Sequence, residues 1–230
     1  MALIENTFAN TGELNAAFAS KISLILSQAI TEKGVASIVV SGGRTPLPLF
    51  KILSQQTLDW SKVTIALADE RWVANDHPDS NEKLVRENLL VDEASAATFF
   101  AMKTESANAE DAVTVLSQSS QQPAVPFDVL ILGMGEDAHT ASLFPCCDQI
   151  SQGLNLSSGE VFIATTPKTA PHQRMSYTLP ALIKAKNIFL HLTGDKKREV
   201  LLAALSAENE AEKPIKAVVE RAPVTLMWAP

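Results

Sequence analysis

Cysteine is scarce in this 230-residue sequence, which has only 2, adjacent at Cys146 and Cys147. Such a pair supplies neither a disulfide framework nor the spaced thiols of a zinc site. No apolar run approaches the ~18–20 residues that a membrane span needs. The N-terminal residues lack the basic and apolar segments of a secretory signal. We therefore expect a cytoplasmic protein in a reducing compartment, with no membrane partner.

Positive charge is also in short supply, with 19 Lys and Arg against 26 Asp and Glu and a net charge of -7. This balance argues against a nucleic-acid partner. It is compatible with a small anionic substrate, because a site needs only local positive charge. Hydrophobic residues make up 46% of the chain, which is enough for a substantial core. We expect residues 1–230 to form a single domain.

Strand and helix patterns alternate along the chain. Short apolar runs rich in β-branched residues predict strands, and helical spacing of apolar residues predicts helices between them. The predicted strands are 37–40, 63–68, 98–101, 128–132, 161–165, 187–191 and 224–228, and the predicted helices are 13–30, 46–53, 80–90, 109–118 and 195–205. Such runs suit strands covered on both faces. The pattern therefore predicts an α/β fold with a mainly parallel sheet flanked by helices on both faces.

Four polar segments directly follow predicted strands: 41–45, 69–71, 133–140 and 193–197. In open α/β sheets, ligands bind beyond the carboxyl ends of the strands. We therefore expect these four segments to meet at one edge of the sheet and to form the functional site.

The first of these segments reads Ser41, Gly42, Gly43, Arg44 and Thr45. Glycines allow backbone N–H groups to approach an anion closely, and the other three side chains add hydrogen-bond donors. The Gly-Lys-Ser/Thr ending of a Walker A loop is missing. A phosphate cradle and an ordinary strand-to-helix turn are both compatible with this pattern.

The third segment begins with Gly-Met-Gly-Glu-Asp-Ala at 133–138, which formally matches a dinucleotide-binding fingerprint. That fingerprint should open a long helix, but Pro145 follows soon after it. Glu136 and Asp137 would also repel a pyrophosphate. We therefore expect no nucleotide cofactor.

His139 is the strongest catalytic candidate. It follows two carboxylates in a loop beyond the clearest predicted strand, and a carboxylate such as Asp137 can orient an imidazole that accepts a proton. The alternative is a histidine with a structural role in the loop, which we expect for His191 within its strand. No His-Glu-x-x-His or comparable cluster is present, so we predict no metal.

Positive charge for an anionic ligand is available at Arg174 and at Lys196 and Lys197. Each of these side chains could equally be solvated at the surface. A lysine at the start of the last long helix would lie where the helix dipole favours an anion. The sequence does not choose between Lys196 and Lys197, and we select Lys196.

Together these segments resemble the glucosamine-6-phosphate isomerase/6-phosphogluconolactonase family, in particular its lactonase branch. The carriers are Ser-Gly-Gly-Arg-Thr-Pro at 41–46, Ala-Asp-Glu-Arg-Trp at 68–72, Gly-Met-Gly-Glu-Asp-Ala-His-Thr-Ala-Ser-Leu-Phe-Pro at 133–145, Pro-His-Gln-Arg-Met at 171–175 and Gly-Asp-Lys-Lys at 194–197. The resemblance implies a modified Rossmann-like fold and no cofactor. It also implies hydrolysis of a phosphorylated sugar lactone, 6-phospho-D-glucono-1,5-lactone, to 6-phospho-D-gluconate in the oxidative pentose phosphate pathway.

The resemblance also implies roles for individual residues. His139 would be the general base that activates water, Asp137 would orient it, and Arg71 would position the sugar ring or offset charge on the carbonyl oxygen. Asp69 would hold Arg71 or a sugar hydroxyl. The remaining substrate- and phosphate-binding candidates are Ser41, Gly42, Gly43, Arg44, Thr45, Arg174 and Lys196.

The sequence departs from the family pattern at Ala138, where the family usually has glycine between the aspartate and the histidine. If this position needs a positive φ, alanine costs about 1 kcal/mol or more. Two other functions stay open: an amino-sugar phosphate deaminase or isomerase, and a sugar-phosphate-binding regulator that has lost catalysis. We expect a monomer or a weak homodimer.

Overall fold

A central parallel sheet organises the molecule. The computed structural model describes residues 3–119, 122–123 and 125–230. In this part of the chain seven strands pair in the order β1-β10-β9-β6-β2-β3-β5, and every pairing is parallel. The strands are β1 (Leu3–Thr7), β2 (Ala36–Val40), β3 (Val63–Leu67), β5 (Thr98–Phe100), β6 (Val129–Leu132), β9 (Ile188–Thr193) and β10 (Val224–Ala229). The predicted parallel sheet is confirmed.

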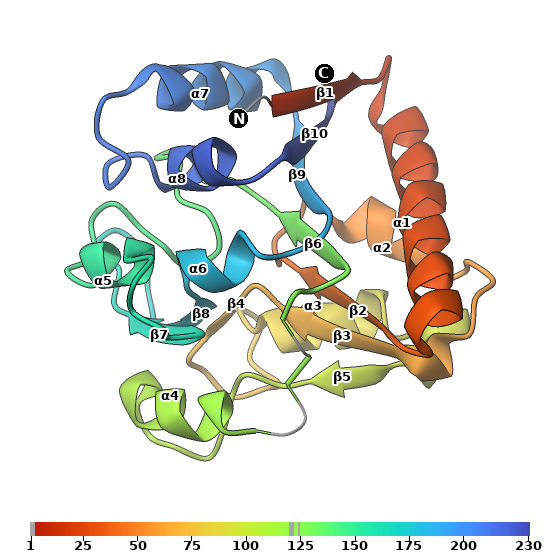
Figure 1. Ribbon diagram of the computed structural model, residues 1–230, viewed down its shortest axis with the longest axis horizontal. Coiled ribbons are helices and arrows are strands. Elements are labelled where there is room, and N and C mark those ends of the chain that lie inside the picture. Colours follow the sequence, from red (N-terminus) through yellow and green to blue (C-terminus); the bar gives the residue numbers. More distant parts are fainter. Residues whose placement is uncertain (1–2, 120–121, 124) are drawn as a thin grey trace.

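Helices cover both faces of this sheet, as its sequence requires. Every residue of β2 and of β6 is buried, so neither face of these strands can be left to solvent. Helices α1 (Thr11–Lys33) and α2 (Leu47–Leu53) lie on one side, and α6 (Leu179–Leu182) and α8 (Pro214–Arg221) lie on the other (Figure 1). The other helices are α3 (Asn81–Asn88), α4 (Ala109–Ser117), α5 (Ile150–Leu154) and α7 (Asp195–Ser206), with two short 3₁₀ helices, η1 (Trp60–Lys62) and η2 (Asp92–Ala96).

Local capping residues determine where several helices begin and end. The Asn10 side chain accepts a hydrogen bond from the Glu13 N–H, and Gly34 ends α1 with φ 83°. For this reason α1 is longer than the predicted 13–30. Ser80 caps α3 by accepting from the Lys83 N–H, as predicted. None of the helices in the described ranges is both long enough and apolar enough to cross a membrane.

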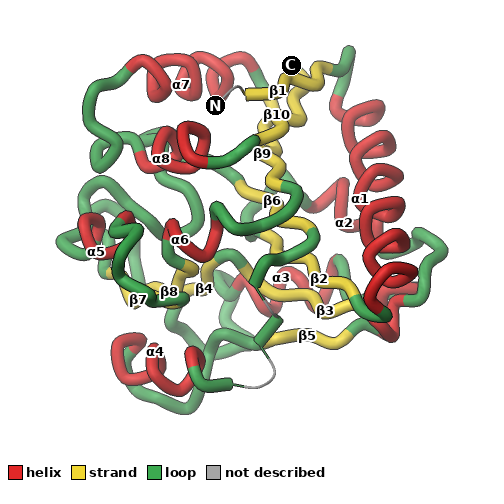
Figure 2. Tube along the Cα trace, in the orientation of Figure 1, coloured by secondary structure: helices red, strands yellow, loops and turns green. Residues whose placement is uncertain are grey.

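A second, antiparallel sheet differs from what the sequence predicts. It consists of β4 (Asp69–Arg71), β8 (Arg174–Tyr177) and β7 (Phe162–Thr165), in the order β4-β8-β7. The sequence indicates the strand at 161–165 but not that it pairs outside the main sheet, because the choice of partner depends on other segments of the fold. Figure 2 shows this sheet in the loop-rich half of the molecule.

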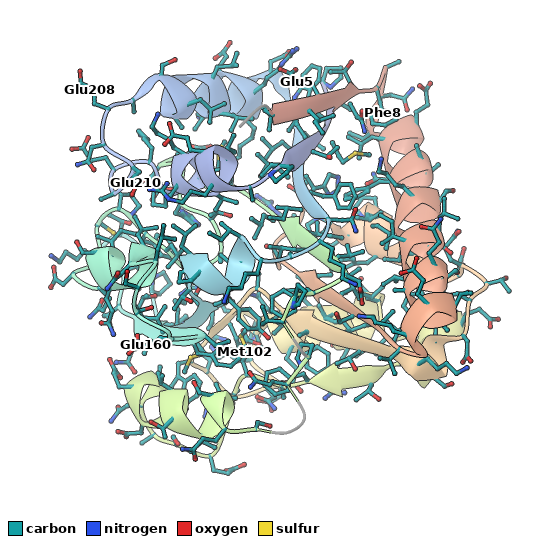
Figure 3. All side chains as sticks on the ribbon, viewed as in Figure 1. Glu5, Phe8, Met102, Glu160, Glu208 and Glu210 are labelled. Atoms are coloured by element: carbon teal, nitrogen blue, oxygen red, sulfur yellow. The ribbon has the colours of Figure 1, made fainter. Side chains whose placement is uncertain are left out.

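The edge strand β1 and the helix α8 are likewise absent from the predicted elements. β1 is exposed or half-buried throughout, so its five residues carry little apolar pattern. Figure 3 labels a buried and an exposed side chain of the loops. Met102, just after β5, is completely buried, whereas Glu208, in the α7–α8 loop, is exposed at the surface.

Candidate active site

A cavity of about 230 Å³ opens at the carboxyl ends of four neighbouring strands, β9, β6, β2 and β3. Beyond β2 the chain continues on one side to β3 and β5, and it then returns to place β6 and β9 on the other side. This reversal of strand order is where open α/β sheets bind ligands. Segments far apart in the sequence therefore meet at one edge of the sheet. The predicted site residues that line the cavity are Ser41, Gly42, Gly43, Thr45, Asp69, Arg71 and His139.

Ser41 joins the two strands on either side of the reversal. Its Oγ donates to the backbone O of Ile131 at 3.1 Å and accepts the N–H of Gly133 at 3.3 Å. Because the hydroxyl proton is already donated to the backbone, Ser41 shapes the cavity floor rather than offering a free donor to a ligand.

The next two residues need to be glycine for different reasons. A Cβ at Gly42 would lie 1.9 Å from Oδ1 of Asn81, and Gly43 has φ +92°. The Asn81 side chain lines the cavity and donates to the backbone O of Asp69 at 2.8 Å. Arg44, in contrast, is exposed and is not among the residues that line the cavity.

His139 and Asp137 form a directly bonded pair. Nδ1 of His139 lies 2.5 Å from Oδ1 of Asp137, and the same oxygen accepts the His139 N–H at 3.2 Å. The imidazole also stacks on the Phe144 ring, with centroids 4.0 Å apart. Burial raises the pKa of Asp137, but the His139 hydrogen bonds and charge outweigh it, so the net pKa is lowered. The ionised carboxylate favours the tautomer with the proton on Nδ1, which leaves Nε2 as the basic atom.

Gly135 provides the space that the imidazole occupies. A Cβ at this position would lie 2.2 Å from both Cε1 and Nδ1 of His139 and 2.6 Å from Oδ1 of Asp137. The backbone N–H of Gly135 donates to the His139 O at 2.9 Å and closes the loop. Residue 135 must therefore be glycine, because a side chain at this position would occupy the space of the His139 imidazole.

We expect Gly135→Ala to lower kcat by about tenfold or more, because a reacting group displaced by ~1 Å loses much of its effect. The added methyl group meets the end of a ring that can turn away, so the free energy of unfolding should change little. Steady-state kinetics and thermal unfolding measure both. Gly133→Ala is the matched control, since a Cβ there has no atom within 4 Å. Equal losses of kcat in the two variants would contradict this explanation.

Ala138 has φ 68°, the left-handed conformation in which the family's glycine would be unstrained. His139 nevertheless keeps its bond to Asp137 and lines the cavity, so the substitution does not misplace it. The Ala138 methyl group is completely buried, and this burial offsets part of the strain.

We expect Ala138→Gly to change the free energy of unfolding by less than about 1 kcal/mol. Relief of the left-handed strain is worth about 1–2 kcal/mol. Loss of the buried methyl group costs about 0.8 kcal/mol, and the added freedom of the unfolded chain costs about 0.4–1 kcal/mol. Urea unfolding of both proteins measures the difference. A change of several kcal/mol in either direction would show that this cancellation is absent.

Two arginines face each other across the second sheet. Arg71 of β4 pairs in register with Arg174 of β8. Nη1 of Arg71 donates to the Asp79 O at 2.7 Å, and Nη2 of Arg174 donates to the Pro171 O at 2.9 Å. Both Nε atoms are buried without a hydrogen-bond partner in the part of the chain that the structure describes. Burial and then the charge of Arg71 lower the pKa of Arg174 from its ordinary value.

This pairing places like charges side by side, which is unfavourable unless an anion offsets it. Arg71 lines the cavity, whereas Arg174 is almost fully buried and does not. Arg174 therefore lies beside Arg71 and outside the cavity lining in this structure, and the direct ligand contact expected for it stays a prediction.

Glu70 holds the backbone around Arg71. Its carboxylate accepts the N–H groups of Arg71 at 2.6 Å, Asn81 at 2.8 Å and Glu82 at 2.7 Å, and so it ties β4 to the start of α3. Burial raises the pKa of Glu70 despite these hydrogen bonds. The sequence alone assigns Glu70 no role, because three of its four hydrogen-bond partners, Ser80, Asn81 and Glu82, lie at a helix start that only the fold brings near.

The structure places Lys197, not Lys196, at the cavity. Lys197 lines it and donates through Nζ to the Met134 O at 2.9 Å. Lys196 is largely exposed, and its Nζ lies 3.3 Å from Oε2 of Glu136. Consecutive residues of a helix point about 100° apart, so only one of the two can face the cavity from the start of α7. Lys197 is therefore the lysine at the cavity in this structure, and phosphate binding by Lys196 stays a prediction.

Asp69 is buried at the cavity wall, where the sequence predicts that it holds Arg71 or a sugar hydroxyl. Oδ2 accepts a hydrogen bond from Oγ of Ser142 at 2.5 Å. The expected bond to Arg71 is absent from the described residues. Asp69 therefore connects the β3–β4 turn to the loop that carries His139.

Other residues that line the cavity fall outside the predicted site, among them Asn81, Lys197 and His191. Burial lowers the pKa of His191 to about 4, and neither ring nitrogen has a hydrogen-bond partner in the described chain. The His191 ring packs edge-to-face on Phe18, and the structural role expected for it stays a prediction. The potential metal ligands His77, Asp79 and His172 cluster outside the residues that line the cavity.

Known proteins resemble this chain over nearly its whole length. The sequence profile of the family described as glucosamine-6-phosphate isomerases/6-phosphogluconolactonase matches residues 9–228. A 6-phosphogluconolactonase of Rhizobium meliloti (strain 1021) is 39% identical over 225 residues, which cover 97% of each chain. Another, of Neisseria meningitidis serogroup B (strain ATCC BAA-335 / MC58), is 43% identical over 217 residues, or 92% of each chain.

Solved structures show the same relationship. A crystal structure of a 6-phosphogluconolactonase from Shewanella baltica OS155 has a TM-score of 0.96 and 41% identity, covering 100% of this chain and 98% of that one. A monomeric glucosamine-6-phosphate deaminase has a TM-score of 0.80 at 16% identity, covering 99% of this chain and 97% of that one. At 16% identity, the comparison with the deaminase shows only that the two folds are alike. The fold is thus shared by two reactions, and the site residues must distinguish them.

Proposed function

The chain belongs to the glucosamine-6-phosphate isomerase/6-phosphogluconolactonase family, and from this premise we propose that it hydrolyses 6-phospho-D-glucono-1,5-lactone to 6-phospho-D-gluconate. Relatives named 6-phosphogluconolactonase match almost the whole chain. The observation that carries the proposal is the cavity itself, which contains a carboxylate-oriented imidazole together with an arginine and a lysine. This reaction belongs to the pentose phosphate pathway.

His139 is the proposed general base. With Nδ1–H bonded to Asp137, Nε2 accepts a proton from water as the water oxygen attacks C1 of the lactone. The bond from C1 to the ring oxygen then breaks, and the imidazolium returns the proton to that oxygen. One water is consumed and one carboxylic acid is formed. The ionised Asp137 stabilises the imidazolium between these two steps.

Cationic side chains complement the His139–Asp137 pair in the proposed site. Arg71 and Lys197 line the cavity and offset negative charge on the phosphate and on the developing oxyanion. The backbone of Gly42 and Gly43 and the Thr45 side chain are proposed to contact the phosphate. Arg174 adds charge from behind Arg71. Arg44 and Lys196, which do not line the cavity, are assigned no direct contact.

None of these steps calls for a metal or a cofactor. An imidazole removes the proton from water, and guanidinium and ammonium groups offset the negative charge. The substrate is proposed to be a small phosphorylated sugar lactone. A monomer or weak homodimer in the cytoplasm stays a prediction.

A direct assay tests the proposal. Freshly formed phosphorylated lactone is mixed with the protein in a buffer where spontaneous hydrolysis is slow, and proton release is followed. We expect hydrolysis well above the spontaneous rate and no ammonia from glucosamine 6-phosphate. Ammonia release without lactone hydrolysis would establish the deaminase alternative. Binding of 6-phosphogluconate without any turnover would establish a non-catalytic regulator.

A further inference from the structure

Three potential metal ligands converge outside the catalytic cavity. His77 and Asp79 lie on the loop between β4 and α3, and His172 lies on the loop between β7 and β8. Their ligand atoms all lie within 4.8 Å of one another. Nε2 of His172 is 3.0 Å from Oδ2 of Asp79, and Nδ1 of His77 is 3.9 Å from the same oxygen. Two loops far apart in the sequence therefore present two imidazoles and one carboxylate to a common point.

This donor set matches a particular class of ion. Two imidazole nitrogens and a carboxylate oxygen suit zinc and its neighbours among the divalent transition metals, whereas calcium and magnesium prefer all-oxygen sites. Zinc bonds of ~2.0–2.1 Å in a tetrahedron place ligand atoms ~3.3–3.4 Å apart. The observed separations of 3.0 and 3.9 Å bracket that spacing. The third separation, between the two imidazole nitrogens, is at most 4.8 Å, so the side chains must turn toward a common point to complete the geometry.

The protein already holds these ligands in place. His172 adopts φ 69°, a left-handed backbone that a residue other than glycine adopts only at a cost. The two imidazole rings pack edge-to-face with centroids 5.4 Å apart. Nδ1 of His77 accepts the Asp79 N–H at 3.1 Å. This nitrogen therefore carries a lone pair in the neutral ring and faces Asp79, which lies on the same loop. An ion would replace this backbone hydrogen bond.

The cluster is also accessible from solvent. The side chains of His77, Asp79 and His172 are 40%, 51% and 28% exposed. These fractions leave room for an ion to enter and to keep water on its remaining coordination position. The nearby Arg71 opposes a cation, and the carboxylate of Asp79 offsets that charge.

We propose that His77, Asp79 and His172 form a binding site for one divalent transition-metal ion, with zinc the best match. The ion would join the β4–α3 loop to the β7–β8 loop. The backbone O of Asp79 holds Arg71, and the backbone O of Pro171, next to His172, holds Arg174. A metal at this site would therefore fix the two carbonyl groups that orient the arginine pair. The site itself does not depend on which reaction the cavity carries out.

Calorimetric titration of the metal-free full-length chain with zinc chloride tests the proposal. We expect one zinc ion per chain and a higher melting temperature when zinc is bound. His77→Gln and His172→Asn should each weaken zinc binding by at least about tenfold, since even outer-shell changes cost that much. Asparagine tolerates a positive φ, so His172→Asn preserves the loop. Asp76→Asn, which removes an exposed carboxylate from the same loop but not from the cluster, is the matched control and should bind zinc like wild type.

Two further measurements separate this site from other places where zinc could bind. His139→Asn removes the active-site imidazole and should leave zinc affinity unchanged. Substitution by cobalt(II) should give the visible absorption of a nitrogen- and oxygen-ligated ion. A thiolate charge-transfer band would instead place the ion at Cys146 and Cys147 and would overturn the proposal. Zinc binding that survives in His77→Gln and His172→Asn, or that is lost in His139→Asn alone, would also overturn it.

Discussion

Replacing His139 with asparagine is expected to lower kcat by at least about a hundredfold, the size of a general-base contribution. Asparagine fills a similar space and can still donate to Asp137, but it has no basic nitrogen to accept a proton from water. Because the imidazole is partly exposed in the cavity and packs on Phe144, the free energy of unfolding should change little. Lactone hydrolysis and thermal unfolding of the same preparation give both quantities.

The loss should appear in kcat rather than in KM, because His139 is assigned a role in the chemical step and not in holding the phosphate. Glu136→Gln is a suitable control, since it changes an exposed carboxylate in the same loop that pairs with Lys196. Turnover near the wild-type value in His139→Asn would remove this residue from the base role. A large loss of kcat in Glu136→Gln would mean that turnover depends on the loop as a whole and not on the imidazole.

Replacing Arg174 with alanine is expected to raise KM for the phosphorylated lactone by about ten- to a hundredfold, or ~1.4–2.7 kcal/mol, because a positive charge behind Arg71 is lost. The guanidinium is buried beside Arg71, so its charge is poorly screened by water. kcat should fall much less, because the reacting carbonyl is assigned to Arg71 and His139. Initial rates over a range of lactone concentrations separate the two parameters.

Two comparisons make this test specific. Arg44→Ala removes the same charge from an exposed position that does not line the cavity and should leave KM within about twofold, the scatter expected for screened surface charges. An unphosphorylated gluconolactone should be affected far less by Arg174→Ala than the phosphorylated one. Equal effects on the two lactones would show that Arg174 does not act through the phosphate. Arg174→Lys retains the charge and should recover part of the affinity if the protein remains folded.

The order of strands and helices is predictable because burial leaves a local pattern. β2 and β6 are buried on both faces, and their runs of consecutive apolar residues indicate this from the sequence alone. Ser80 is identifiable as the α3 cap from residue type and position. β1 has no such signal, whereas α8 carries one that the predicted elements leave out, with Pro214 at its first position and Ile215, Val218 and Val219 buried at helical spacing. The antiparallel sheet escapes prediction because β4 becomes a strand only through pairing with β8, a distant segment that no local pattern specifies.

Part of the candidate site can likewise be predicted from the sequence, and part cannot. The loop from 133 to 140 and the glycines at 42 and 43 are identifiable from their residue types, and the structure places them at the cavity. The position of Lys197 depends on the direction in which the first turn of α7 faces. Asp69 contacts Ser142 and Glu70 contacts Asn81. The roles of Asp69 and Glu70 depend on these contacts, and no sequence spacing predicts them.

The amino-acid pattern is therefore enough to predict the parallel sheet, the edge at which four loops gather and the residue types placed there. Each of these follows from interactions between neighbours in the chain or from the general geometry of parallel strands. Which charged side chain faces the cavity, which one lies behind it and how two loops come together around His172 depend on the tertiary structure. These outcomes are decided by a few ångströms of packing between distant segments, where a rotation of one residue along a helix or strand turns a side chain from the cavity to solvent.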